Sequence, residues 1–104
     1  MDQTEVIAKV KRYAELVCSH FAIEKVVLYG SHARGMAGID NDIDVAIVVR
    51  KMEKGFFEVE PLLWRLRREI DSLIEPVLVE EDNDPAGFLN EILKTGIIIY
   101  NSAA

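Results

Sequence analysis

The sequence predicts an α/β domain in which helices flank a small mixed β-sheet. Short apolar runs bounded by turn residues alternate with longer segments whose apolar residues recur at helical spacing, which is the order expected of an α/β chain. The chain has 104 residues, and half of them are hydrophobic. That is enough for one modest core, so residues 1–104 are expected to fold as a single domain.

Composition narrows the classes of function. The formal net charge is −6, which argues against nucleic acid as the main partner. Cys18 is the single cysteine, so no internal disulfide is possible. We find neither a signal peptide nor an apolar stretch long enough for a bilayer, and a cytoplasmic protein is therefore expected.

The first elements are a helix over residues 2–20 and a strand over 25–29. Asp2 followed three positions later by Glu5 is typical of a capping box at a helix start. The positions expected to face the core recur at helical spacing and are Val6, Val10, Ala14, Val17 and Phe21. The strand is an apolar run that stops at Gly30.

A short helix over residues 31–35 and a loop over 36–41 lead to a second strand, over about 42–50. This strand is apolar on both faces, so it is expected at the centre of the sheet. A long helix over 56–73 follows, with an inner stripe of Leu62, Leu66, Ile70 and Leu73. Exposed ion pairs are expected on it at i,i+4 spacing, Arg65 with Glu69 and Arg67 with Asp71.

The last third predicts a strand, a helix and a terminal strand. The strand covers 75–79, and Pro76 fits best at a strand start or at a sheet edge. Asp84 followed by Pro85 predicts a helix start, and Lys94 with Gly96 predicts its end. Residues 97–100 are a short apolar strand or an extended tail, and residues 101–104 are expected to fray.

The residues that best suit chemistry lie where the first strand ends and the second begins. Alternation along a strand places Asp42 and Asp44 on one face, where their repulsion is tolerable if they share a cation. Oxygen ligands without His or Cys favour Mg²⁺ or Mn²⁺, which often also bind substrate phosphates. Gly30 allows close approach of a phosphate to the backbone, and Ser31 adds a hydroxyl. The stretch therefore predicts a site for a metal and a phosphate.

Other interpretations of these residues were weighed. An isolated Asp-x-Asp before a strand is often a solvated turn. An EF-hand loop would need Gly and Glu where this chain has Val45 and Lys51, and a Walker P-loop is absent. Arg34 is a candidate either to contact a nucleotide phosphate or to pair with a site carboxylate and hold the loop, and the second role is favoured slightly. His32 is expected to be exposed.

The whole pattern resembles a known signature. Gly30-Ser31, then ten residues, then Asp42-x-Asp44 resembles the DNA polymerase β-type nucleotidyltransferase superfamily. The string Gly-Ser-His-Ala-Arg-Gly at 30–35 is similar to its small bacterial and archaeal members, the minimal nucleotidyltransferases; Asn41 stands where these often have Ser. The resemblance runs over residues 22–80. It implies the polymerase β-like fold and a third carboxylate at the start of the next strand, which is Glu75, with Glu80, Glu81 and Asp82 as rivals.

The resemblance also implies a reaction. A nucleoside monophosphate, AMP from ATP being the expected case, is transferred to a hydroxyl with loss of pyrophosphate. Asp42, Asp44 and Glu75 would hold two Mg²⁺ ions at the catalytic centre, and Gly30, Ser31 and Arg34 would bind the nucleotide.

The acceptor is expected on another chain, since a chain of this length leaves no room for an acceptor-binding domain. Small members of the family are often paired with an all-helical partner of the HEPN type in toxin–antitoxin modules, where the nucleotidyltransferase is the antitoxin. The alternative function is a non-catalytic antitoxin that neutralises its partner by contact. Apolar residues around Trp64 or in the terminal strand are a candidate surface for a second copy.

Overall fold

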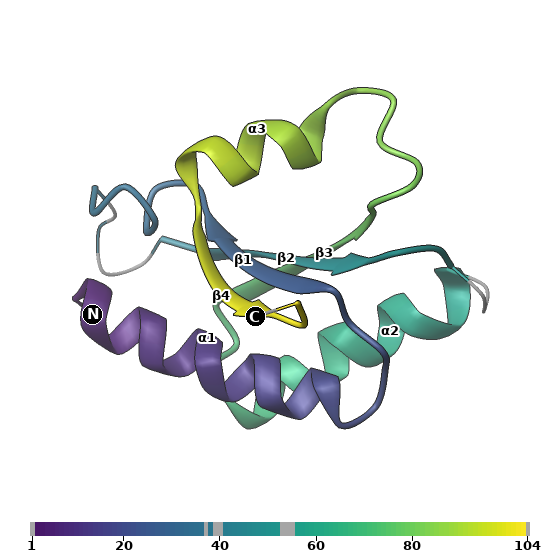
Figure 1. The fold of residues 1–104 in the computed structure, drawn as a ribbon. Helices are drawn as coiled ribbons and strands as arrows, with labels where there is room; N and C mark the ends of the chain where they lie inside the picture. The colour runs from purple at the N-terminus through teal and green to yellow at the C-terminus, as the bar shows by residue number, and fades with distance from the viewer. Residues whose placement is uncertain (1, 37, 39–40, 53–55, 104) are drawn as a thin grey trace.

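The computed structural model describes residues 2–36, 38, 41–52 and 56–103. Its sheet has four strands in the order β3-β2-β1-β4, with α1 and α2 on one face and α3 on the other (Figure 1). The predicted fold class, a small mixed sheet flanked by helices, is confirmed. In chain order the elements are α1 (Gln3–Cys18), β1 (Lys25–Tyr29), β2 (Ile43–Val49), α2 (Phe56–Leu66), a 3₁₀ turn (Arg67–Glu69), β3 (Ile74–Glu80), α3 (Phe88–Thr95) and β4 (Ile97–Asn101).

The central strand is β2, as its two-sided apolar pattern predicts. It runs antiparallel to β1 and parallel to β3, and β4 joins the sheet antiparallel to β1. The register pairs Asp44 with Tyr29 on one side and with Glu75 on the other. The edge strand β3 contains Pro76 near its start, which agrees with the edge position expected for a proline.

Alternating residues of β2 serve two hydrophobic cores. Ile43, Val45 and Ile47 are fully buried against the face covered by α1 and α2. Ala46 and Val48 pack on the opposite face in a cluster with Leu89 and Ile92 of α3. Because side chains alternate along a strand, Asp44 projects toward the α3 face.

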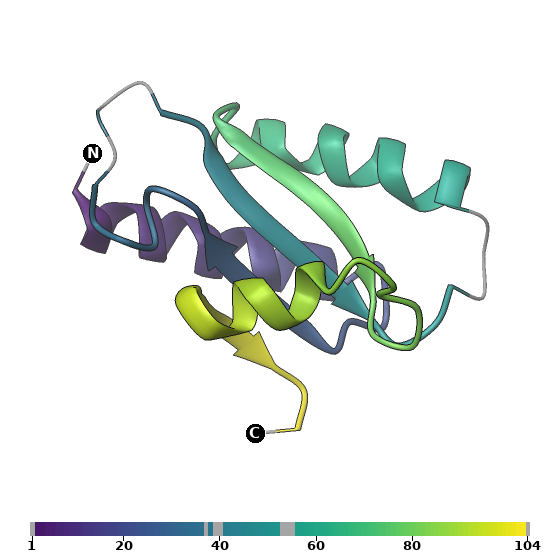
Figure 2. The same cartoon turned by 90° about the horizontal axis from the view of Figure 1, so that it is seen from above.

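The α3 face is only partly covered. Seen from above, α3 lies over β1 and leaves the β3 side of this face without a covering helix (Figure 2). Val77 of β3 is accordingly 38% exposed. The acidic end of β2 therefore lies on an accessible part of the sheet. Across the described ranges, no helix combines the length and apolar character that a membrane span requires.

Helix α1 begins as predicted and ends slightly early. The Asp2 side chain accepts a hydrogen bond from the backbone N–H of Glu5 at 2.8 Å, which is the expected capping contact. Its predicted core positions are buried, except that Phe21 lies beyond the helix and is half-buried. Tyr13 is also fully buried, and its hydroxyl donates to the carbonyl of Leu63 at 2.8 Å, which ties α1 to α2.

The long helix predicted over 56–73 is wrong at its C-terminal end. Helix α2 ends at Leu66 and continues only as the 3₁₀ turn. The buried stripe is Val59, Leu63 and Leu66, whereas the other predicted stripe positions, Leu62, Ile70 and Leu73, are half-buried. Residues 70–73 then connect the 3₁₀ turn to β3 at the edge of the sheet.

The predicted ion pair between Arg67 and Asp71 is also wrong. Nη1 of Arg67 donates to the backbone carbonyls of Ser72 and Ile74, at 2.7 and 3.0 Å. Asp71 instead pairs with Lys9 of α1 at 2.7 Å. Arg67 and Asp71 contact other parts of the fold because α2 ends at Leu66, so no regular helix places the two side chains one turn apart.

The last helix begins three residues later than predicted. Its first residue is Phe88, and Gly87 before it has φ +71°, a left-handed conformation that interrupts any helix from Pro85. Asp84 still caps α3, since its carboxylate accepts from the N–H groups of Phe88 and Leu89 at 3.1 and 2.8 Å. The helix ends before Gly96, as predicted.

The C-terminal segment forms the second edge of the sheet. Strand β4 includes Asn101, and the N–H of Ser102 donates to the carbonyl of Glu24 at 2.9 Å. The prediction that the chain frays from residue 101 is therefore wrong for Asn101 and Ser102, and Ala104 lies outside the described residues.

Candidate active site

The turn after β1 brings the backbone close to a carboxylate. Gly30 has φ +75°, and a Cβ at this position would clash with Oδ2 of Asp44. Both the left-handed backbone and the close approach require glycine. The Asp44 carboxylate consequently lies directly against the turn that was predicted to receive a phosphate.

Residues 31–35 form hydrogen-bonded turns rather than the predicted short helix. The N–H of Arg34 donates to the carbonyl of Gly30 at 3.3 Å, and the N–H of Met36 donates to that of Ser31 at 3.0 Å. Gly35, with φ +69°, ends this stretch before a helix can grow. An anion here would therefore meet the N–H groups of a turn and not a helix N-terminus.

Three acidic residues converge beside the turn. Asp44 in β2 and Glu75 in β3 are neighbours in the parallel register, and Asp42 lies just before β2. Burial raises the pKa of the Glu75 carboxyl group, and Asp42 lies close enough for its charge to raise that pKa further. Asp42 is exposed, while Asp44 and Glu75 are half-buried. The structure thus brings together the three residues proposed from the sequence as metal ligands.

Their proximity changes the acid–base properties of the site. Burial and the charge of Asp42 raise the pKa of Asp44, and His32 opposes this increase. Burial, Asp42 and Asp44 raise the pKa of Glu75, and Arg67 opposes it. Burial together with the charges of Asp44 and Glu75 raises the pKa of Tyr29 to about 12. Clustered carboxylates with raised pKa values are typical of functional sites.

The cluster fits a hard divalent cation in its chemistry. All three donors are carboxylates, the ligand type that Mg²⁺ and Mn²⁺ prefer. In the described ranges, no set of three or more His, Cys, Asp or Glu side chains adopts a ready-made metal-binding arrangement.

The rival carboxylates lie elsewhere. Glu80 is at the opposite end of β3 from Glu75, where it pairs in register with Val49. Glu81 forms an ion pair with Lys25 at 3.5 Å, and Asp82 is exposed in the following turn. Of the four candidates for the third acidic position, only Glu75 joins the aspartates.

Ser31 and Arg34 differ in how they are held. Ser31 is half-buried, and its Oγ accepts from Nδ2 of Asn41 at 3.3 Å. Arg34 is exposed, and within the described part of the chain its guanidinium forms no ion pair. The favoured interpretation of Arg34, pairing with a site carboxylate, is therefore not supported.

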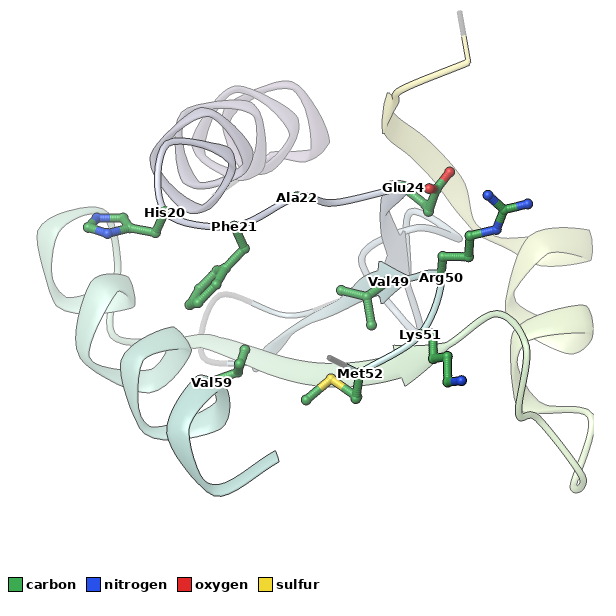
Figure 3. A pocket seen from close by; sticks show the side chains of 9 residues that line it. All are labelled: His20, Phe21, Ala22, Glu24, Val49, Arg50, Lys51, Met52 and Val59. Atoms are coloured by element: carbon green, nitrogen blue, oxygen red, sulfur yellow. The ribbon is translucent and has the colours of Figure 1, made fainter. Parts of the chain in front are cut away.

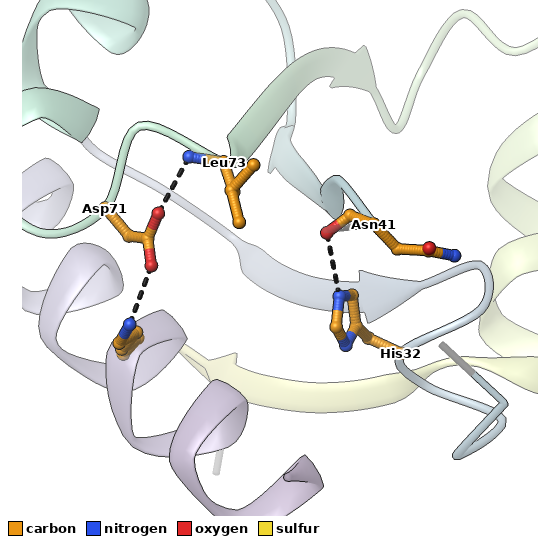
Figure 4. A network of polar contacts seen from close by, with 5 residues as sticks. His32, Asn41, Asp71 and Leu73 are labelled. Atoms are coloured by element: carbon orange, nitrogen blue, oxygen red, sulfur yellow. Dashed lines mark hydrogen bonds and ion pairs between the residues drawn. The ribbon is translucent and has the colours of Figure 1, made fainter. Parts of the chain in front are cut away.

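His32 is the site residue that sequence reasoning misjudged. It was expected to be exposed, yet only 4% of its surface is accessible. Its Nε2 lies 3.0 Å from the carbonyl oxygen of Asn41 (Figure 4). The signal available in the sequence was its position between the two motif halves, where a polar ring can reach across the loop.

A cavity lies away from the acidic cluster. It has a volume of about 400 Å³ and apolar walls that include Phe21, Val49, Met52 and Val59 (Figure 3). It lies near the start of β1 and the end of β2, whereas Gly30 and Asp44 lie at the other end of these strands. The acidic residues therefore converge at the end of the sheet opposite this cavity.

Comparison with known proteins agrees with this fold. Residues 11–104 match the family described as "Polymerase beta, Nucleotidyltransferase". The chain is 26% identical over 99 residues to a Methanocaldococcus jannaschii protein named "Putative protein adenylyltransferase MJ0141", covering 93% of this chain and 98% of that protein.

Two solved structures share the fold. A "putative nucleotidyltransferase" from Sulfolobus solfataricus superposes with a TM-score of 0.71 at 22% identity, over 97% of this chain and 85% of that one. A chain of a "toxin-antitoxin with AMP-PNP" superposes with a TM-score of 0.67 at 17% identity, over 88% and 73%. The family match spans most of the chain and includes both halves of the Gly-Ser and Asp-x-Asp motif, so this chain belongs to the polymerase β nucleotidyltransferase family.

Proposed function

We propose that this protein transfers AMP from ATP to a hydroxyl group of a partner protein and requires Mg²⁺. The observation that carries the proposal is the convergence of Asp42, Asp44 and Glu75 beside the Gly30 turn. Membership of the nucleotidyltransferase family supports the reaction class. The name of the Methanocaldococcus jannaschii relative, a protein adenylyltransferase, supports AMP as the group and protein as the acceptor.

The turn after β1 would bind the triphosphate. Gly30 lets the turn approach the Asp44 carboxylate closely, so a cation held by Asp44 would lie beside a phosphate bound at this turn. Asn41 donates to Oγ of Ser31, so the Ser31 hydroxyl keeps its own proton for a phosphate oxygen. The exposed Arg34 extends from the same turn and would contact the phosphates, the other of its two candidate roles.

Asp42, Asp44 and Glu75 would hold the cations, as a two-metal site. Bound Mg²⁺ would neutralise charge on the carboxylates and on the phosphates during transfer. The raised pKa values of Asp44 and Glu75 support this assignment, because burial and the neighbouring carboxylates make the charged forms costly and a bound cation would offset that cost.

The proposed reaction is a displacement at the α-phosphorus of ATP. The acceptor oxygen forms a bond to the α-phosphorus, and the bond from that phosphorus to the oxygen bridging to the β-phosphate breaks. Pyrophosphate leaves with the electron pair of this bond. The acceptor proton would pass to the Glu75 carboxylate, which lies beside Asp44 in the parallel register.

We propose a helical protein of the HEPN type as the acceptor, with this chain as its antitoxin. The likeness to a chain of a toxin–antitoxin complex supports this through the fold alone. The net charge of −6 favours a protein over a nucleic acid acceptor, because polyphosphate backbones would be repelled.

The test is transfer of label from α-phosphate-labelled ATP with Mg²⁺, in a lysate containing the proteins of neighbouring genes. Wild type is expected to label a protein band, and the Asp42→Asn/Asp44→Asn double variant is expected to label none. Asp82→Asn removes an exposed carboxylate at the far end of β3 and should label as wild type does.

Two results would contradict the proposal. Equal labelling by wild type and the double variant would show that the acidic cluster is not the catalytic centre. Absence of label with any of the four nucleoside triphosphates, despite measurable nucleotide binding, would favour the non-catalytic antitoxin. In that case the double variant should still neutralise the partner.

A further inference from the structure

His32 holds a buried polar contact inside the motif. Among the residues whose burial the structure describes, it is the one polar or charged residue in the buried class. Its Nε2 lies 3.0 Å from the carbonyl oxygen of Asn41 (Figure 4). A carbonyl only accepts, so Nε2 carries the proton and donates it. Burying a polar group is costly unless it is hydrogen-bonded, so this contact determines where the ring lies.

The backbone that carries the ring is itself fixed by α1. Nε2 of Gln3, the first residue of α1, donates to the carbonyls of His32 and Ala33 at 3.0 and 3.1 Å. The N–H of Gly35 also donates to the His32 carbonyl, at 3.2 Å. Helix α1 packs on the core through fully buried valines such as Val6. The imidazole is therefore anchored to the body of the protein through its own backbone.

The residue at the other end of the contact directly precedes Asp42. Nδ2 of Asn41 also donates to Oγ of Ser31 at 3.3 Å. These two contacts close the segment 31–41 at its base, so that the proposed phosphate site at Ser31 and the first carboxylate at Asp42 stay close together. The strand pairing of Tyr29 with Asp44 already brings the ends of this segment together, and these two contacts extend that closure to Ser31 and Asp42.

We propose that His32 is a positioning residue for the cation site, and this inference rests on the proposed function. Its Nε2–H holds the Asn41 carbonyl, and through it the backbone of Asp42, so that the Asp42 carboxylate is placed beside Asp44 and Glu75. His32 touches neither the cation nor the substrate. Loss of the hydrogen bond weakens cation binding because Asp42 must then be ordered by the cation itself.

Two substitutions of His32 test the hydrogen bond to Asn41, because both introduce a neutral amide but only one of the amides extends as far as Nε2 does. The side-chain nitrogen of Gln lies about as far along the chain as Nε2 of His, whereas that of Asn corresponds to Nδ1. His32→Gln therefore keeps a donor for the Asn41 carbonyl, and His32→Asn does not. The matched control is His20→Asn, which changes the other histidine, an exposed one, in the same way.

The measurement is Mn²⁺ binding to the nucleotide-free protein by titration calorimetry, with thermal unfolding of each variant. Affinity in His32→Asn is expected to fall about 10- to 100-fold, the usual cost of losing a residue that orients a metal ligand. His32→Gln and His20→Asn are expected to bind as wild type does. Because both His32 variants are neutral amides, a purely structural role would not separate their cation affinities.

The outcomes distinguish this inference from the proposed function. If His32→Asn binds Mn²⁺ like wild type, or if His32→Gln is equally weakened, the positioning role is wrong. Asp44→Asn is measured in parallel, and wild-type affinity in that variant would overturn the cation site and with it the proposed function. If His32→Asn does not unfold cooperatively, His32→Met is measured in its place, since Met is about as long as Gln but has no donor for the Asn41 carbonyl. Wild-type affinity in His32→Met would then overturn the inference.

Discussion

Asp44 is placed where a carboxylate is costly. It is half-buried against the Gly30 turn, and it faces Asp42 and Glu75. Like charges opposite each other on neighbouring strands destabilise a sheet. Burial and, after it, the charge of Asp42 raise the pKa of Asp44. The raised pKa reflects the same energetic cost, because the side chain avoids that cost by binding a proton. Removing the charge of Asp44 is therefore expected to stabilise the folded protein when no cation is bound.

We therefore expect Asp44→Asn to stabilise the cation-free protein while abolishing transfer. The folded pKa values of Asp44 and Glu75 lie above their ordinary values of 3.8 and 4.5, so the folded state binds more protons above these values. The free energy of unfolding then falls as pH rises from about 4 through the raised pKa values. At pH 7 the variant should gain on the order of 1 kcal/mol, roughly 4–8 °C in melting temperature.

The check is thermal unfolding in EDTA from pH 4 to pH 8. The wild-type melting temperature should fall across the raised pKa range more than that of the variant. An equal or lower melting temperature in Asp44→Asn at pH 7 would show that repulsion at this site does not limit stability.

At the scale of elements, the segment between α2 and β3 places Glu75. Arg67 lies over the Trp64 ring, 4.5 Å from its centroid, and binds the Ser72 and Ile74 carbonyls. Its Nε is buried and finds no hydrogen-bond partner in the described chain, and the stacking and the Nη1 contacts offset that cost. Asp71 accepts from the N–H of Leu73 at 2.8 Å (Figure 4). Arg67 and Asp71 were predicted to form an exposed pair on a helix. They instead bind backbone groups where β3 starts.

Replacing Asp71 by Ala should destabilise the fold in a pH-dependent way. The change removes the ion pair with Lys9 and the acceptor for the Leu73 N–H, worth about 1.5–3 kcal/mol for a charged hydrogen bond. Burial tends to raise the pKa of Asp71, but the bonds from Lys9 and Leu73 outweigh it and lower the pKa below 3.8. This contribution is present above pH 3.8 and is lost as pH falls through the lowered pKa.

Urea unfolding at pH 7 and at pH 3 tests this. The difference between wild type and Asp71→Ala should be full at pH 7 and smaller at pH 3. Asp82→Ala removes an exposed carboxylate and should change little at either pH. A pH-independent loss in Asp71→Ala would assign its effect to packing rather than to the charge.

At the scale of the whole molecule, the sheet presents two different ends. The acidic cluster lies at one end, on the face that α3 covers incompletely, and the 400 Å³ cavity lies at the other (Figures 2 and 3). Tyr29 packs edge-on against Phe88 of α3, with centroids 5.5 Å apart, and borders the cluster. Binding at the acidic end involves residues of β2 and β3 together, so it is coupled to the stability of the whole sheet.

Divalent cation with a non-hydrolysable ATP analogue should accordingly raise the melting temperature of the whole domain. A ligand that binds only the folded state at 100 times its dissociation constant stabilises by about 2.7 kcal/mol. The Asp42→Asn/Asp44→Asn variant should gain none of this, and EDTA should reverse the gain in wild type. Equal stabilisation of both proteins would place the ligand elsewhere, with the distant cavity as the first region to examine.

Local sequence patterns were sufficient to predict much of the secondary structure of this protein. The strand over 25–29, the central position of β2, the edge position of Pro76 and the end of α3 at Gly96 follow from apolar periodicity and turn residues, which act over a few positions. The motif halves at Gly30 and Asp44 were also recognisable, since their residue types suit phosphate and metal. Each of these depends on chemistry within a short window of the chain.

What only the tertiary structure decided depends on partners far apart in the chain. Asp71 forms its ion pair with Lys9 and not with Arg67, and buried His32 contacts the carbonyl of Asn41. The parallel register places Glu75, and not Glu80, beside Asp44. The sequence by itself determined the class of fold and the motif. The tertiary structure decided which polar side chains pair, because a buried polar group must form a hydrogen bond with a group that the folded chain places next to it.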